Sequence, residues 1–139
     1  MDDPATGWIT RLSEDECRAR LGTTTVGLIA FVDDEDGQQL LPVNFAVLGG
    51  VIYFLTATDG VLARLATGRT DVAFAVTHAD IFGVGWNVTV HGTARSVDDP
   101  KTLDLVMSYE RLRPWPGGTR PLLVQIAPER IAGRRVVAG

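Results

Sequence analysis

The sequence predicts a mainly β protein with short helices, built as one small antiparallel barrel. Six β-rich segments recur along the 139 residues, most connections between them are short, and three short segments carry helix signals. Short connections favour antiparallel pairing, and strands at this spacing favour a small barrel. We therefore expect a six-stranded antiparallel split β-barrel that occupies residues 1–139 as a single domain, with a loose N-terminus over 1–11. Strands are expected over 23–32, 40–47, 51–57, 72–77, 85–97 and from 122 onward, and helices over 12–22, 59–68 and 98–112.

The first two elements are a helix and a strand. Ser13 and Glu16 have the spacing of a capping box, and Gly22 is a typical stop, so a helix is expected over 12–22. Segment 23–32 is β-rich and almost wholly apolar, which predicts a strand covered on both faces. An acidic, exposed turn follows it.

A hairpin and a short helix come next. Segments 40–47 and 51–57 flank a Leu-Gly-Gly turn, which is a good hairpin signal. Thr58 or Asp59 is expected to cap the helix over 59–68, and a glycine ends it.

In the second half of the chain, 72–77 reads as a buried strand and 85–97 alternates most cleanly. The alternation places Trp86 on one face with two valines, and Asn87 on the opposite face. Core packing alone explains Trp86, and a solvated or interface face alone explains Asn87. Contact with a ligand is an equally good interpretation of either residue.

The last elements are a helix and a bent strand. Asp98 or Asp99 is expected to cap the helix over 98–112, with a proline in its first turn. A Pro/Gly-rich loop over 113–121 leads to the final segment, which begins as a strand and is expected to bend at Pro128.

Composition excludes several classes of function. Hydrophobic residues make up 45% of the chain and the formal net charge is -4. The chain can therefore fill a core, but it lacks the positive field that gathers nucleic-acid phosphates. The single cysteine, Cys17, excludes an internal disulfide and suits a reducing interior. The sequence shows neither a signal-peptide pattern nor an apolar run of roughly 20 residues, so we expect a cytoplasmic protein with no nucleic-acid or membrane partner.

Catalytic and metal-binding patterns are missing from the sequence. His78 and His91 are isolated, and no His, Cys or Asp cluster has metal-ligand spacing. Neither histidine has an evident nucleophilic partner, so no catalytic residue and no metal site is assigned.

The order of short motifs resembles a known family. "LPVNF" and "GWNVTVHGTA" are the most specific of these motifs, and "VIYFLTATDG", "VAFAV" and "VQIAPERIAGRR" follow the same order. Over roughly residues 12–135 the chain resembles the pyridoxamine 5'-phosphate oxidase-related flavin-binding split barrels, and most of all their small branch that includes nitroimidazole-resistance-type proteins.

The resemblance implies a homodimer with FMN at the subunit interface and redox chemistry on a small organic molecule. Asn44 supports this interpretation, because an amide in an apolar strand suits the donor and acceptor groups of a flavin edge. Without the resemblance, a solvent-facing or backbone-bonded amide is the simpler reading. The residues that the resemblance assigns to the cofactor are Val43, Asn44 and Phe45 on one strand, Leu55 and Thr56 on the next, Thr58, Gly60, Val61 and Leu62 at the turn into the helix, and Trp86 and Asn87 on the later strand.

One departure from the family pattern leaves the identity of the cofactor undecided. Related proteins usually place a lysine just after the glycine of this turn, where Val61 and Leu62 stand here, and Asp59 adds a repulsive charge. Backbone N–H groups and Arg64, one turn further on, are expected to compensate. The alternative is a barrel that binds F420, haem or no cofactor and acts as a binding module.

Overall fold

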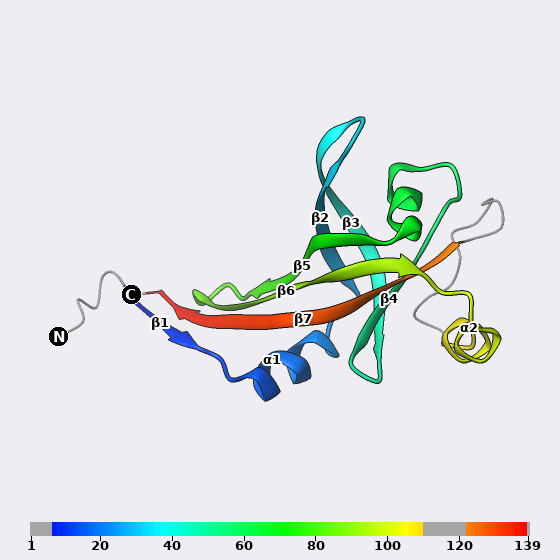
Figure 1. Cartoon of the computed structure of the whole chain (residues 1–139). Helices are drawn as coiled ribbons and strands as arrows, with labels where there is room; N and C mark the ends of the chain where they lie inside the picture. The colour runs from blue at the N-terminus through cyan, green and yellow to red at the C-terminus, as the bar shows by residue number, and fades with distance from the viewer. Residues whose placement is uncertain (1–6, 110–121, 139) are drawn as a thin grey trace.

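Seven antiparallel strands and three short helices make up the described part of the chain (Figure 1). The structure is a computed structural model and describes residues 7–109 and 122–138. The Pro/Gly-rich loop expected over 113–121 and the last residues of the helix expected over 98–112 lie outside these ranges. The strands are β1 (Trp8–Arg11), β2 (Val26–Asp33), β3 (Gly37–Leu48), β4 (Val51–Thr56), β5 (Arg69–Ala79), β6 (Val84–Ser96) and β7 (Leu122–Val137), and the helices are α1 (Glu14–Leu21), the 3-10 helix η1 (Val61–Thr67) and α2 (Pro100–Met107).

Six of the strands close into a ring, as the sequence predicts. The sheet order is β1-β7-β4-β3-β2-β5-β6, and an additional pairing of β6 with β7 closes it. Closure depends on the length of β7, because one 16-residue strand pairs with β6, β4 and β1. No helix among the described residues is long and apolar enough to span a membrane.

The prediction of a loose N-terminus over 1–11 is wrong for its last four residues. Trp8–Arg11 form β1, which pairs with the end of β7 from Trp8 opposite Val137 to Arg11 opposite Arg134. The strand carries no clear local signal because all four of its side chains are exposed. Backbone pairing with β7 holds this segment in place instead.

The core is the interior of the ring. Phe45, Phe54 and Phe74 are fully buried, and the rings of Phe45 and Phe74 meet edge to face with centroids 4.8 Å apart. Such pairs add stabilisation beyond the buried area alone. Val88 and Val90 of β6 point into the same core, and Trp86 packs at its edge, as the alternation predicts.

The prediction that segment 23–32 is covered on both faces is wrong for the single chain. Burial alternates along β2, and Val26 and Val32 are 54% and 62% exposed. The reason is geometric: a barrel strand has one face inside and one outside. An apolar outer face therefore remains uncovered in the isolated chain.

Two of the three helix starts follow the predicted chemistry. Ser13 Oγ accepts the N–H of Glu16 at 3.2 Å, and Glu16 Oε1 accepts the N–H of Ser13 at 3.1 Å, which completes the capping box. Asp99 caps α2 by accepting the Thr102 N–H at 2.9 Å.

The third helix start differs from the prediction. Neither Thr58 nor Asp59 caps η1; extended Gly60 stands at that position and makes no side-chain cap bond. A glycine can take this position at little cost, and the short 3-10 turn leaves fewer N–H groups to satisfy.

The bend predicted at Pro128 coincides with a β-bulge. The register of β6 and β7 shifts between Gly92 opposite Pro128 and His91 opposite Arg130, so that Glu129 is the extra residue. A bulge accommodates a proline because it interrupts the hydrogen-bond ladder locally. The strand then continues to Val137.

The bulge generates a prediction about stability. A Cβ atom added to Gly92 would lie 2.2 Å from the carbonyl oxygen of Ala127, so the backbone must shift to admit it. We expect Gly92→Ala to lower the free energy of unfolding by about 1–3 kcal/mol in urea denaturation. Gly22→Ala is the control, because a Cβ atom added there would lie 3.6 Å from the Ala19 carbonyl oxygen, which is ordinary contact. Equal stability of the two variants would contradict the close packing of this bulge.

Candidate functional site

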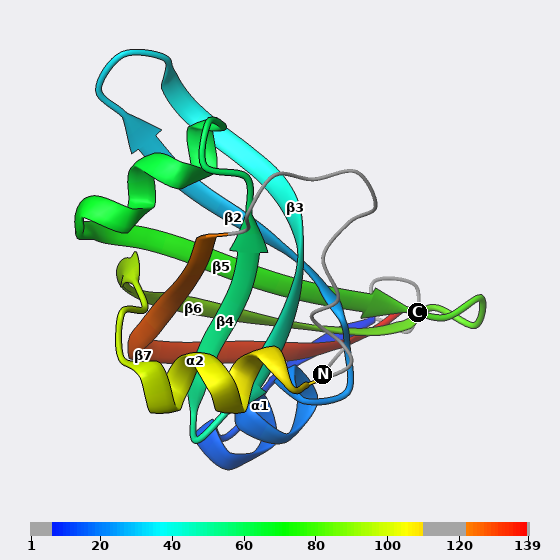
Figure 2. The same cartoon turned by 90° about the vertical axis from the view of Figure 1, so that its right-hand side faces the viewer.

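The barrel opens where β3 and β4 separate. The two strands pair over four positions, from Leu48 opposite Val51 to Phe45 opposite Phe54, and the pairing then stops (Figure 2). Asn44 and Leu55, which come next in register, are not paired with each other. We call this opening the split.

The neighbours of the two strands maintain the split. The first half of β3 pairs with β2, as far as Asn44 opposite Val26. The end of β4 pairs with β7, through Leu55 opposite Leu123 and Thr56 opposite Leu122. The predicted residues Val43, Asn44, Leu55 and Thr56 therefore border one opening, on two different strands.

Side-chain direction divides the three predicted residues of β3. Val43 and Phe45 point into the core, so they can offer only backbone groups to a ligand. Asn44 points to the outside. The N–H of Phe45 donates to the Thr25 carbonyl at 2.9 Å, and N–H direction alternates along a strand. The N–H of Asn44 therefore faces the β4 side, where pairing has ended.

The turn after β4 offers no cation. Val61 and Leu62 are half-buried and pack against the core. Thr58 is exposed, and Gly60 is extended, with its carbonyl accepting the Ala63 N–H at 3.0 Å. At the position where the resemblance implies a lysine, this chain thus has aliphatic side chains that pack against the core.

Arg64 is paired with the acidic turn that joins β2 to β3. Its guanidinium contacts Asp33, lies 2.7 Å from Asp36 Oδ2 and lies 3.5 Å from Glu35 Oε2. These contacts differ from the predicted contact with a phosphate. A phosphate at the turn would compete with three carboxylates for this guanidinium.

Asp33 is the centre of this network. Its side chain is 3% exposed and accepts the backbone N–H groups of Asp36 at 2.9 Å and Glu35 at 3.1 Å. These backbone bonds, the Asp36 N–H foremost, together with Arg64 hold the pKa of the Asp33 carboxyl below its ordinary value. Arg69, at the start of β5, adds a contact at 3.7 Å. The network therefore joins the β2–β3 turn to η1 and to β5.

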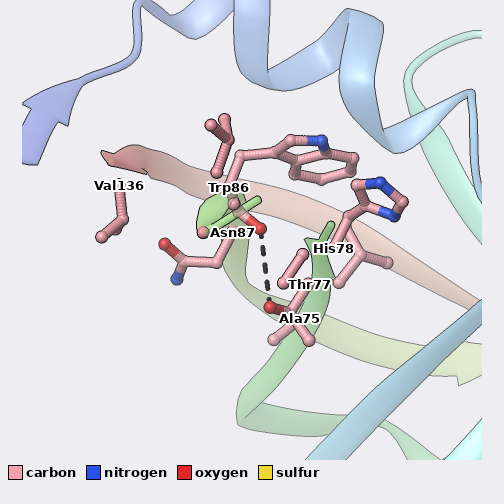
Figure 3. A pocket seen from close by; sticks show the side chains of 11 residues that line it. Ala75, Thr77, His78, Trp86, Asn87 and Val136 are labelled. Atoms are coloured by element: carbon pink, nitrogen blue, oxygen red, sulfur yellow. Dashed lines mark hydrogen bonds between the residues drawn. The ribbon is translucent and has the colours of Figure 1, made fainter. Parts of the chain in front are cut away.

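Trp86 and Asn87 lie on opposite faces of β6. The Trp86 ring faces α1, with the Arg20 guanidinium 5.3 Å and the His78 ring 6.0 Å from its centre (Figure 3). Asn87 lies on the outer face. In a single chain, these two side chains therefore point to opposite sides of β6.

A hollow of about 490 Å³ lies beside Asn87. Of the twelve predicted cofactor residues, only Trp86 and Asn87 line it; the others lie at the split, in the following turn or in η1. The structure thus brings the predicted residues together at two places on the barrel. The hollow is lined by Ala75, Val76, Thr77, His78, Ala79, Gly83, Val84, Gly85, Trp86, Asn87 and Val136 (Figure 3).

The strand registers connect the two places across the outer face. Asn44 pairs with Val26 on β2, and Thr77 pairs with Asn87, which in turn pairs with Arg134. Two residues along from Val26, β2 pairs with β5 through Leu28 opposite Ala75. Sequence reasoning missed the position of Thr77 and Arg134 beside Asn87, because only the strand order shows it.

The described residues offer no metal site and no activated thiol. Among residues 7–109 and 122–138, no three His, Cys, Asp or Glu side chains are placed to hold a metal ion. Cys17 is buried, and this burial raises the pKa of its thiol.

Comparison with known proteins gives the family. The family model described as pyridoxamine 5'-phosphate oxidase matches residues 13–135. The chain belongs to the pyridoxamine 5'-phosphate oxidase family. The closed ring with a split between β3 and β4 is thus the form that this family's fold takes here.

Three similar proteins cover nearly the whole chain. The FAD-binding protein of Mycobacterium smegmatis is 30% identical with a TM-score of 0.80, covering 94% of this chain and all of that one. A candidate pyridoxamine 5'-phosphate oxidase of Corynebacterium glutamicum is 30% identical with a TM-score of 0.78, covering 100% and 98%. The uncharacterized protein Rv0080 of Mycobacterium tuberculosis is 29% identical over 136 residues, covering 94% and 87%.

The Asp33 network predicts how stability depends on pH. A carboxyl whose pKa is lower in the folded state stabilises the fold above its unfolded pKa, about 3.9, and loses that contribution as the pH falls through the folded value. We expect the melting temperature to fall over this range in the wild type, and the slope to be smaller in Asp33→Asn. Asp59→Asn, outside the network, serves as control. Identical acid profiles for the wild type and Asp33→Asn would contradict this role of Asp33.

Proposed function

We propose that this chain is a homodimeric, flavin-dependent oxidoreductase that binds its flavin between subunits at the split. A nicotinamide or deazaflavin donor reduces the flavin, and a small organic acceptor or oxygen reoxidises it. The observation that carries the proposal is the end of β3–β4 pairing at Phe45, which leaves the Asn44 N–H beside an outward amide. The family and a 30%-identical FAD-binding protein support it.

A flavin fits the chemistry of this edge. Its ring system presents donors and acceptors in one plane, and the Asn44 side chain supplies one of each kind. The backbone of β3 beside it adds groups of the same type. Buried polar edges require such partners, because an unpaired group costs about 1–3 kcal/mol.

A second copy of the chain is expected over the outer face of β2 and β3. Exposed aliphatic side chains gather there, and a contiguous apolar patch on a soluble protein commonly marks an interface. A stable dimer buries roughly 800 Å² per subunit. Because Asn44 lies on this face, and Asn87 lies on the outer face of β6, two strands away from β2, a dimer formed through it would place the cofactor between subunits. The exposed aliphatic residues are Val26, Leu28, Val32 and Leu40.

The charges at the turn favour FAD over FMN. A terminal phosphate such as that of FMN concentrates about −1.5 to −2 charges on one phosphate at pH 7, whereas FAD spreads a similar total charge over the two phosphates of its diphosphate. Val61 and Leu62 provide no cation, and Arg64 already contacts three carboxylates. FMN is therefore the second choice, and F420 or haem would require a different fit at the same opening.

When bound, the flavin supplies the hydride and electron transfer. The chain binds and orients it: Asn44 holds the ring edge, and the aliphatic outer face excludes water. No side chain is assigned as a general acid or base.

Equilibrium dialysis with separate ligands tests the proposal. Purified protein is dialysed against FAD, FMN, F420 and haem, and its mass is measured by light scattering. We expect a dimer that binds FAD more tightly than FMN, with a shifted flavin absorption band. Binding of F420 or haem alone would replace the flavin proposal with a binding module. Failure to bind any of the four would overturn the cofactor role.

Restoring the missing cation should tighten FMN binding. A charge-assisted hydrogen bond contributes about 1.5–3 kcal/mol, so Leu62→Lys is expected to lower the FMN dissociation constant roughly ten- to a hundredfold. Riboflavin, which has no phosphate, should bind equally well to the variant and to the wild type. Leu105→Lys, at an exposed position on α2, is the control. If the FMN affinity of Leu62→Lys equals that of the control, the phosphate does not lie at this turn.

A further inference from the structure

The β5–β6 hairpin projects beyond the barrel, at the end far from η1. In Figure 1 it lies beside β1 and the end of β7, and together these strands form an arm. The registers of Ala79 with Gly85, Gly85 with Val136 and Val136 with Ile9 hold the arm together. The tip of the hairpin is the turn Asp80–Gly83.

Two large apolar side chains stand on this tip. Ile81 is 93% exposed and Phe82 is 81% exposed, more than any other large hydrophobic residue that the structure describes. Two such neighbours on one turn form an apolar knob. Water contact at this knob is unfavourable, and covering it would contribute to association.

The turn that carries the knob is firmly hydrogen-bonded. Asp80 Oδ1 accepts the N–H groups of Phe82 at 2.8 Å and Val84 at 3.1 Å, and the Asp80 N–H donates to the Val84 carbonyl at 2.9 Å. The Gly83 carbonyl accepts the N–H of Ala138 at 2.8 Å, which ties the tip to the chain after β7. The knob is thus held in place before any contact, which lowers the entropy cost of binding.

The hollow beside Asn87 lies on the same hairpin. Alanine and glycine residues form much of its lining, and because their side chains are small or consist of hydrogen alone, they leave a space of about 490 Å³. Gly85 itself is required by close packing of the hairpin, because an added Cβ atom would lie 2.9 Å from the His78 carbonyl oxygen. Thr77, Asn87 and Val136 contribute larger side chains to its lining.

We propose that, in the homodimer, each subunit inserts its Ile81–Phe82 knob into the hollow on the β5–β6 hairpin of the other. The inference rests on the homodimer of the proposed function. Knob and hollow are on one hairpin, so a single twofold rotation makes both contacts at once, as an isologous interface requires. The exposed side chains of Ile9 and Val136 continue the apolar surface around them.

This contact makes the partner a component of the site. The knob of one subunit then lies against Asn87 of the other, so that the Asn87 side of the site gains an apolar wall only in the dimer. An apolar wall excludes water and strengthens the polar contacts that remain inside. A single chain lacks this wall.

Disulfide trapping tests the contact. Phe82→Cys and Ala75→Cys chains are co-expressed, reduced, reoxidised and run on a non-reducing gel; native Cys17 is buried and does not compete. We expect a covalent dimer in this pair. Phe82→Cys with Leu105→Cys is the matched control, because Leu105 is exposed on α2, outside the surfaces proposed for the dimer. Equal trapping in the two pairs, or none in either, would overturn the proposal.

Sedimentation equilibrium separates this inference from the proposed homodimer. Phe82→Asp should weaken the dimer about 30-fold or more, as expected for a central interface residue. Leu105→Asp on α2 should leave it unchanged. A monomeric wild type would overturn the homodimer and this contact together. A dimeric wild type with Phe82→Asp equally dimeric would overturn only the contact.

Discussion

The point at which β3 stops pairing with β4 is the constraint on which the site depends. Near their shared turn the two strands stay paired, which keeps the ring continuous. Beyond Phe45 and Phe54 each strand follows its other neighbour, β2 or β7. The six-stranded ring is therefore continuous, although β3 and β4 separate over part of their length. The opening presents peptide groups and the Asn44 amide on a scaffold fixed by the aromatic core.

Electrostatics around the split distinguish this chain from what its resemblance implies. The acidic turn between β2 and β3 gathers both Arg64 and Arg69, with buried Asp33 between them. This network stabilises the attachment of η1 to the barrel and at the same time occupies the guanidinium nearest the predicted phosphate site. Arg64 is thus held by carboxylates in the single chain, and its contact with a phosphate stays a prediction. We propose that the choice of cofactor follows from how little phosphate charge this one turn can hold.

Local sequence patterns predicted those elements that depend on interactions between residues close together in the sequence. The capping box of α1, the Asp99 cap and the alternation of β6 depend on residues a few positions apart, and all three are confirmed. β1 was missed because its exposed residues gain order only from β7 at the other end of the chain. The partners of Arg64 were missed for the same reason, since they lie 28 and 31 positions away.

Side-chain direction limited the prediction of the site. The resemblance assigned Val43, Phe45, Trp86 and Asn87 to one cofactor, although alternation along a strand sends neighbours to opposite faces. In the barrel, Val43 and Phe45 face the core, while Trp86 faces α1. The hollow and the knob follow from the fold of the arm, which no short motif encodes.

Hydrogen exchange of the Asn44 amide tests the central claim most directly. The account places this N–H on the strand edge that β4 leaves, where a flavin is proposed to bind. Measured by NMR with and without saturating FAD, its exchange should slow by at least tenfold when FAD binds, while the core amide of Phe74 changes little. Bound FAD with unchanged exchange at Asn44 would contradict the account.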